Sequence, residues 1–209
     1  SYSVTGVQTC ALPIFLYYWK NSPSAYKKLV LGLLVFSLFN SSDVFLLLKA
    51  KDAGMNDSAV VGVYIFYNLV YALFSYPVGV IADKVGLKTI FISGLLIFSL
   101  IYSGMAVNSN LYLFYGLFFL YGIYAAAGEG ISKAWISNIS EKKDTATAIG
   151  TYSGLQSICA MLASSITGFV WFRFGATFAF LLTAGMTMMV ALYFIFYIST
   201  NENKSRPAC

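Results

Sequence analysis

The feature that most constrains the fold of this chain is a set of six long apolar segments separated by short polar breaks. Each has roughly the 17 to 25 residues that an α-helix needs to cross a hydrocarbon core about 30 Å thick, with a few to spare for tilt. Membrane-spanning strands are shorter and alternate in polarity, and these segments do not alternate. The sequence therefore predicts an all-α integral membrane protein whose six transmembrane helices cover 28–49, 58–82, 89–107, 111–131, 145–172 and 174–200.

The charged residues agree with a membrane protein and indicate an orientation. Only 13 basic and 8 acidic side chains occur among 209 residues, whereas about a quarter of a soluble domain is charged. When the loops alternate between two sides, ten of the thirteen basic residues share the side of the chain ends, and the other side receives only Lys49, Lys51 and Arg173. The positive-inside rule then places both ends in the cytoplasm, in a multi-pass protein of the plasma (inner) membrane. Because the net charge of +5 reflects topology, no nucleic-acid partner is expected.

The absence of histidine narrows the chemistry of the chain. It removes His-based acid–base catalysis, Ser-His nucleophiles and His-containing metal sites, and the three cysteines lack the spacing of metal ligands. A phosphate-binding G-x-x-x-x-G-K-[ST] sequence is also absent, so this chain does not itself hydrolyse ATP. We therefore expect neither an enzyme nor a bound metal or cofactor.

A motif follows the second apolar segment, where the chain reads G-V-I-A-D-K-V-G-L-K. It resembles the loop signature of the major facilitator superfamily, G-x-x-x-D-[RK]-x-G-[RK]-[RK], although leucine takes the ninth place, where a basic residue is usual. Chemically, the first glycine lets a neighbouring helix approach closely, and the second can adopt the positive φ of a tight turn. The resemblance implies a latch between helices that rock during transport, and the alternative is an ordinary tight cytoplasmic turn. The matching positions are Gly79, Asp83, Lys84, Gly86 and Lys88.

The resemblance covers residues 26 to 200 and implies one six-helix half of a twelve-helix protein. An N-terminal half usually carries an Arg in its fourth helix shortly before a Gly, and 117–122 contains none. The C-terminal half is therefore expected, with a missing N-terminal six-helix half as its partner. Residues 3–14 resemble a translated sequencing adapter, so 1–25 are expected to be non-native or an interdomain loop, and 201–209 a cytoplasmic tail.

Polar side chains within the apolar segments are candidates for a substrate or proton pathway. Asp43 lies about fifteen residues into the first segment, near mid-depth, where an isolated carboxylate costs at least about 2.5–3.5 kcal/mol. It either lines a central cavity or is a buried acid bonded to neighbouring helices or to the extracellular loop. The other candidates recur at helical spacing or lie at mid-depth, and for the tyrosines packing or lipid contact is the alternative. These candidates are Asn40, Tyr64, Asn68, Tyr71 and Gln156.

Two further patterns concern the fourth and fifth segments. Glu129 and Lys133 stand four residues apart in the favourable order, so they form either a charge pair that anchors the helix or, by the family resemblance, an inner gate. Small residues at spacings of four predict close helix contact. These rows are Gly122, Ala126 and Gly130, and Ala160, Ser164 and Gly168.

The leading functional hypothesis is a secondary transporter, in which two six-helix bundles rock around a midplane site and a small molecule or ion crosses the bilayer. Coupling to an ion gradient is expected, with protons as the first candidate. The alternative is a self-assembling six-helix channel, or another membrane protein that works without an upstream half. A membrane enzyme is disfavoured by the missing histidine and by the lack of paired intramembrane carboxylates.

Overall fold

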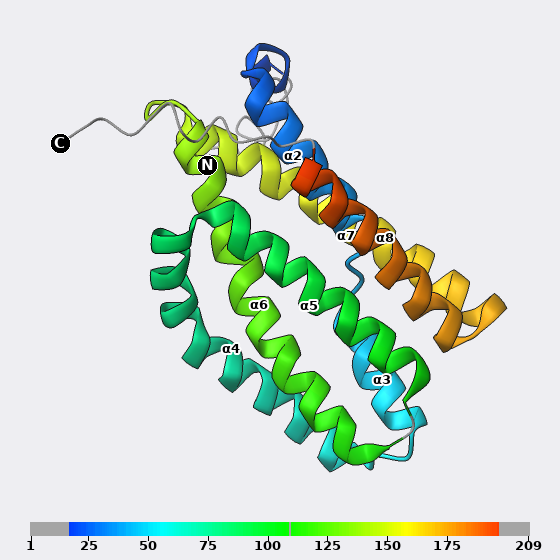
Figure 1. Ribbon diagram of the computed structural model, residues 1–209. Coiled ribbons are helices and arrows are strands. Elements are labelled where there is room, and N and C mark those ends of the chain that lie inside the picture. The colour runs from blue at the N-terminus through cyan, green and yellow to red at the C-terminus, as the bar shows by residue number, and fades with distance from the viewer. Residues whose placement is uncertain (1–16, 109, 197–209) are drawn as a thin grey trace, which may run out of the picture.

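The computed structural model describes residues 17–108 and 110–196, and this part of the chain is helical, without strands. The adapter-like residues 3–14 and the tail at 201–209 lie outside the described residues. Figure 1 shows the helices as an elongated bundle. They are α2 (Ser24–Ser37), α3 (Val44–Asp52), α4 (Asp57–Val85), α5 (Leu87–Val107), α6 (Leu111–Ile139), α7 (Thr145–Phe174) and α8 (Ala176–Phe196).

Five of these helices, α4 to α8, are long and apolar enough to cross a membrane. They correspond to the second to sixth predicted segments. Helices α4 to α7 extend beyond the predicted bounds, by eight residues at the end of α6, whereas α8 begins two residues later than predicted. The all-α membrane fold is thereby confirmed.

The first predicted segment, 28–49, is not one continuous helix, and this corrects the sequence-based boundary. It is divided into α2 and α3 by an irregular stretch at 38–43. The physical reason lies in the run N-S-S-D at 40–43, because Ser, Asn and Asp side chains compete for backbone hydrogen bonds and weaken a helix interior. Figure 1 shows α2 and α3 toward opposite ends of the bundle, with the break between them.

Glycines with positive φ make the sharp connections between consecutive helices. Gly86 has a φ of 103° and alone separates α4 from α5, while Gly175, at 84°, alone separates α7 from α8. L-residues other than Gly rarely adopt such angles, so these turns require glycine. The prediction of a positive φ at Gly86 is confirmed.

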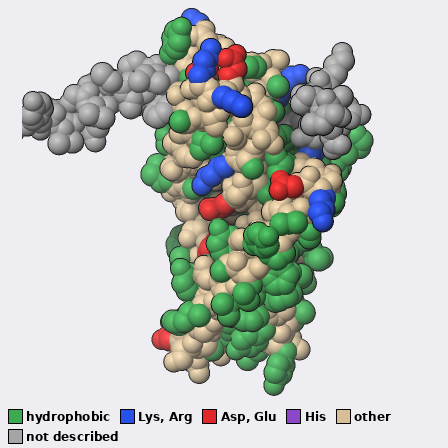
Figure 2. All heavy atoms as spheres, turned by 90° about the vertical axis from the view of Figure 1, so that its left-hand side faces the viewer, with side chains coloured by type: hydrophobic (Ala, Val, Ile, Leu, Met, Phe, Trp, Pro, Cys, Tyr) green, Lys and Arg blue, Asp and Glu red, His purple; other side chains and the backbone are tan. Residues whose placement is uncertain are grey.

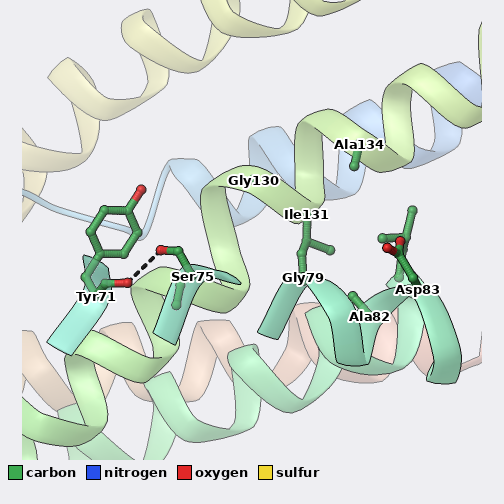
Figure 3. A pocket seen from close by; sticks show the side chains of 10 residues that line it. Tyr71, Ser75, Gly79, Ala82, Asp83, Gly130, Ile131 and Ala134 are labelled. Carbon is green, nitrogen blue, oxygen red and sulfur yellow. Dashed lines mark hydrogen bonds between the residues drawn. The ribbon is translucent and has the colours of Figure 1, made fainter. Parts of the chain in front are cut away.

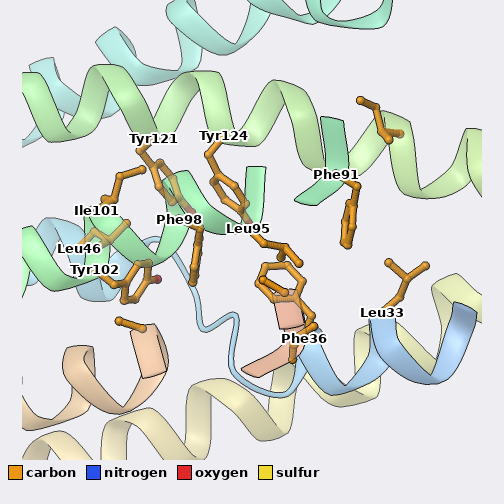
Figure 4. Packing of buried hydrophobic residues seen from close by; sticks show 14 of the residues in the cluster. Leu33, Phe36, Leu46, Phe91, Leu95, Phe98, Ile101, Tyr102, Tyr121 and Tyr124 are labelled. Carbon is orange, nitrogen blue, oxygen red and sulfur yellow. The ribbon is translucent and has the colours of Figure 1, made fainter. Parts of the chain in front are cut away.

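An aromatic core lies between α2, α5 and α6. The rings of Phe98 and Tyr102 stack at 4.2 Å between centroids, and Phe36 meets Phe98 edge to face at 5.4 Å. Tyr124 of α6 closes the group at 4.7 Å from Phe98 (Figure 4). Because lipid tails are as apolar as these side chains, helices in a bilayer are held by such packing rather than by hydrophobic exclusion.

Helices α4 and α6 approach each other closely at Gly122. A Cβ atom on Gly122 would lie 2.7 Å from the carbonyl oxygen of Tyr67 and 2.7 Å from Cβ of Val70. The predicted packing role of this glycine is therefore confirmed. Gly130, in the same row, has no atom within 4 Å of such a Cβ, so the predicted contact is wrong there.

Helices α4 and α7 present largely uncovered apolar faces. Only 17% of the apolar window of α4 and 11% of that of α7 are buried, against 44–50% for α5, α6 and α8. The view in Figure 2 shows Lys and Arg side chains gathered over the upper part of the molecule and hydrophobic side chains over the lower part. These two helices are therefore the ones with surface available for lipid or for a further helical unit.

Candidate functional site at the helix break

The carboxylate of Asp43 is the centre of the candidate site. Asp43 is half-buried and immediately precedes α3, at the end of the break. Its Oδ2 accepts a hydrogen bond of 2.6 Å from the Tyr67 hydroxyl of α4, and its Oδ1 accepts one of 2.5 Å from the Tyr121 hydroxyl of α6. The two phenol rings meet edge to face at 5.3 Å between centroids. Hydrogen bonds to a charged acceptor are stronger than those between neutral groups, so the carboxylate holds the irregular stretch against both α4 and α6.

Tyr67 and Tyr121 were missed by the sequence analysis. Tyr67 stands three residues after Tyr64 and four before Tyr71, so it shares the helical spacing that identified Asn68. Tyr121 directly precedes Gly122, where α6 lies close to the backbone of α4. A carboxylate inside an apolar segment needs hydrogen-bond donors from other segments. Tyrosine hydroxyls near the middle of those segments were therefore candidate partners of Asp43, and Tyr67 and Tyr121 are among them.

The break leaves a buried acceptor unpaired. The backbone N–H of Ser42 donates to Oγ of Ser164 on α7 at 3.3 Å. Oδ1 of Asn40, however, is buried without a hydrogen-bond partner among the described residues. Each such group costs about 1–3 kcal/mol, so a bound water, ion or solute is the ordinary explanation. Irregular backbone at membrane depth is tolerated where it lines a cavity.

A cavity of about 240 Å³ lies between the break, α4 and α6. It is lined by four tyrosines, two amides, two carboxylates and two small residues, without a Lys or Arg. The structure thus brings together five predicted site residues, namely Asn40, Asp43, Asn68, Tyr71 and Glu129, with Tyr67, Tyr121, Tyr124, Ala125 and Gly128.

Two predicted pathway residues do not line this cavity. Tyr64 is 47% exposed, and its carbonyl oxygen accepts a hydrogen bond of 2.8 Å from Nδ2 of Asn68. This hydrogen bond joins the Asn68 side chain to a carbonyl group one turn earlier in the same helix, so one of its two amide N–H groups is already used. Gln156 is half-buried on α7 and is separate from the cavity wall.

Two of the five matching motif residues, Gly79 and Asp83, line a second cavity of about 230 Å³, farther along the same α4–α6 interface (Figure 3). Tyr71 lines both cavities, so the two form a series along α4. Ser75 donates from Oγ to the carbonyl oxygen of Tyr71 at 2.6 Å, which keeps this side chain within its helix. Gly79 and Asp83 line the far part, opposite Gly130 and Ile131 of α6.

The predicted close helix contact at Gly79 is not present. A Cβ atom there would meet no atom within 4 Å, because the residue faces the second cavity instead of a neighbouring backbone. Asp83 and Lys84 belong to the last turn of α4 and are exposed, while Lys88 is half-buried in the first turn of α5. The motif therefore spans a helix end and a one-residue turn.

The predicted anchoring pair of Glu129 and Lys133 is not formed. Both side chains are exposed, and the ion pairs within the described residues join Lys51 to Asp57 at 2.7 Å and Lys143 to Glu141 at 2.9 Å. Glu129 instead lines the cavity of Asp43. An ion pair between exposed side chains contributes little stability, so the spacing alone does not enforce the contact.

The long apolar helices define the class of this protein as a multi-pass membrane protein, with a polar cavity between α4 and α6. The sequence model of the Major Facilitator Superfamily matches residues 18–208, and the chain therefore belongs to this family. Its members are generally transporters rather than enzymes. The chain is also 33% identical over 158 residues to the uncharacterized MFS-type transporter MJ1317 of Methanocaldococcus jannaschii. That match covers 73% of this chain and 40% of the relative, so the chain spans less than half of the relative's length.

Proposed function

We propose that this chain is the C-terminal six-helix half of a secondary transporter that moves a small solute by alternating access, driven by an ion gradient. The observation that carries the proposal is Asp43, an intramembrane carboxylate at a broken helix, facing a polar cavity and bonded to two further helices. Ionisable residues inside membrane segments mark substrate or ion pathways, and broken helices form the sites of many transporters.

The uncovered faces of α4 and α7 support a second half. Both helices are apolar enough to span a membrane, yet they are the least buried within the bundle. The relative is longer than this chain, which leaves room for a partner bundle of similar size. We place that bundle against α4 and α7, with both chain ends on the cytoplasmic side of the plasma membrane.

Protonation of Asp43 offers a simple coupling step. The ionised carboxylate accepts from the phenols of Tyr67 and Tyr121, whereas the protonated acid presents a donor on one oxygen. At least one of the two bonds then weakens, and the break is released from α4 or α6. A proton taken up on one side of the membrane would in this way change which helices move together.

The motif residues and the exposed charges of α6 take the roles of latch and gate in this proposal. Gly79, Asp83, Lys84, Gly86 and Lys88 would engage the second half at the end of α4. Glu129 and Lys133, which are apart here, would find partners in the opposite conformational state. Two-state contacts of this kind are how transporters alternate their access.

The deciding experiment is Asp43→Asn in the protein encoded by the complete gene, reconstituted into liposomes. Gradient-driven transport of a solute found by an uptake and resistance screen should be lost, while expression and monodispersity in detergent stay intact. Asp52→Asn, an exposed carboxylate at the end of α3, is the matched control and should transport normally. Unchanged transport in Asp43→Asn would refute the coupling role. A chain that forms pores alone would instead establish the channel alternative.

A further inference from the structure

We propose that the cavity at the helix break takes a small organic cation, with an ammonium group placed beside Asp43. The inference deepens the proposed function, since it assigns a substrate class to the same cavity. Three independent properties of the cavity wall support it: charge, ring content and a buried acceptor without a donor.

The charge of the wall is purely acidic. Asp43 and Glu129 both line the cavity, and no Lys or Arg is among the lining residues. Lys133, one turn beyond Glu129, is exposed and forms no ion pair with it. An anionic solute would therefore meet two carboxylates without a compensating cation, whereas a cation would be attracted by both.

The ring content of the wall suits an ammonium ion. Four tyrosines line the cavity, two from α4 and two from α6. The hydroxyls of Tyr67 and Tyr121 are fixed on the Asp43 carboxylate, so both rings are held in place before a ligand arrives. Aromatic rings attract cations by about 0.5–2 kcal/mol each, and cages of aromatic side chains are a common way to bind quaternary ammonium groups.

An unpaired acceptor points to the same sign of charge. Oδ1 of Asn40 is buried without a donor although its residue lines the cavity. An oxygen atom left without a donor carries partial negative charge, which stabilises a cation and disfavours an anion.

The size of the cavity suits a small charged group. Its volume of about 240 Å³ is enough for a compact ammonium group beside Asp43.

The test uses choline and its uncharged carbon isostere, 3,3-dimethylbutan-1-ol, which differ in charge but hardly in shape. Binding is measured by calorimetry with the protein of the complete gene, purified in detergent at neutral pH. We expect choline to bind at least about tenfold more tightly than the isostere, since a ring contact and a carboxylate together exceed 1.4 kcal/mol. Equal binding of the two compounds, or binding of neither, would overturn the inference.

Variants locate the preference. Asp43→Asn should bring the affinity ratio of choline to isostere close to one, and the control Asp52→Asn should keep it. Glu129→Gln, at an exposed position that tolerates change, should lower the ratio about twofold and is available if Asp43→Asn fails to fold. A ratio that stays unchanged in both Asp43→Asn and Glu129→Gln would contradict a site at this cavity.

Transport separates this inference from the proposed function. A protein that binds choline through Asp43 but moves no solute across liposomes supports the cation site and contradicts transport. A protein that carries an anionic or neutral solute, without competition by choline, supports transport and overturns the cation site.

Discussion

The hydroxyl of Tyr67 donates a 2.6 Å hydrogen bond to Oδ2 of Asp43 and thereby joins the middle of α4 to the break between α2 and α3. Tyr67 is also the residue whose carbonyl oxygen lies against Gly122 of α6. One residue therefore connects the Asp43 carboxylate with the close approach of α4 and α6. Changes at either contact are expected to affect the other.

Tyr67→Phe removes this hydrogen bond and keeps the ring. A bond to a charged group contributes about 1.5–3 kcal/mol, so the melting temperature in detergent should fall by several degrees. Tyr76→Phe, on the same helix but 80% exposed, is the control and should melt like the parent protein. Identical melting of both variants would mean that the bond adds nothing to stability.

Gly122→Ala is expected to push α4 and α6 apart. The added methyl group would lie 2.7 Å from a backbone oxygen, which cannot move aside as a flexible side chain can. Overpacking of this kind costs about 1–3 kcal/mol, to be measured by thermal or denaturant unfolding. Gly116→Ala, on the same helix with no atom within 4 Å of the new Cβ, should be neutral or stabilising. The prediction fails if the two alanines have the same effect.

Gly86 and Gly79 should respond differently to alanine, although both belong to the motif. Gly86→Ala forces a φ of 103° on an L-residue and should cost about 1–3 kcal/mol of stability. Gly79→Ala meets open space and lies within a helix, so stability should hold or improve. Loss of transport by Gly79→Ala with full stability would support the latch, and normal transport would argue against it.

Glu129→Gln and Lys133→Gln should each change stability by less than about 0.5 kcal/mol, because the two charges are exposed and apart. If they gate transport in another state, each variant should still slow solute uptake in liposomes. Restoration of uptake in the charge-exchanged pair Glu129→Lys with Lys133→Glu would identify them as partners. A large loss of stability in either single variant would instead indicate the anchoring pair.

The membrane architecture was predictable from the chain alone. A helix rises about 1.5 Å per residue, so the number of residues in an apolar segment tells whether a helix of that length can cross the bilayer. Five of the six predicted segments are single helices in the structure. The turn at Gly86 was predictable for a similar reason, because positive φ depends on the residue itself. These properties are local.

The candidate site depended on contacts between distant residues. Asp43 was visible in the sequence as a costly charge, but its partners Tyr67 and Tyr121 lie 24 and 78 residues away. The chain contains 16 tyrosines, and the packing of α4 against α6 decides that these two lie beside Asp43. The spacing of Glu129 and Lys133 permitted a pair, yet both side chains are exposed and no ion pair joins them. Length and composition thus determined how many times the chain can cross the membrane, whereas helix packing decided which polar groups meet inside it, because hydrogen bonds and cavities are properties of neighbours in space.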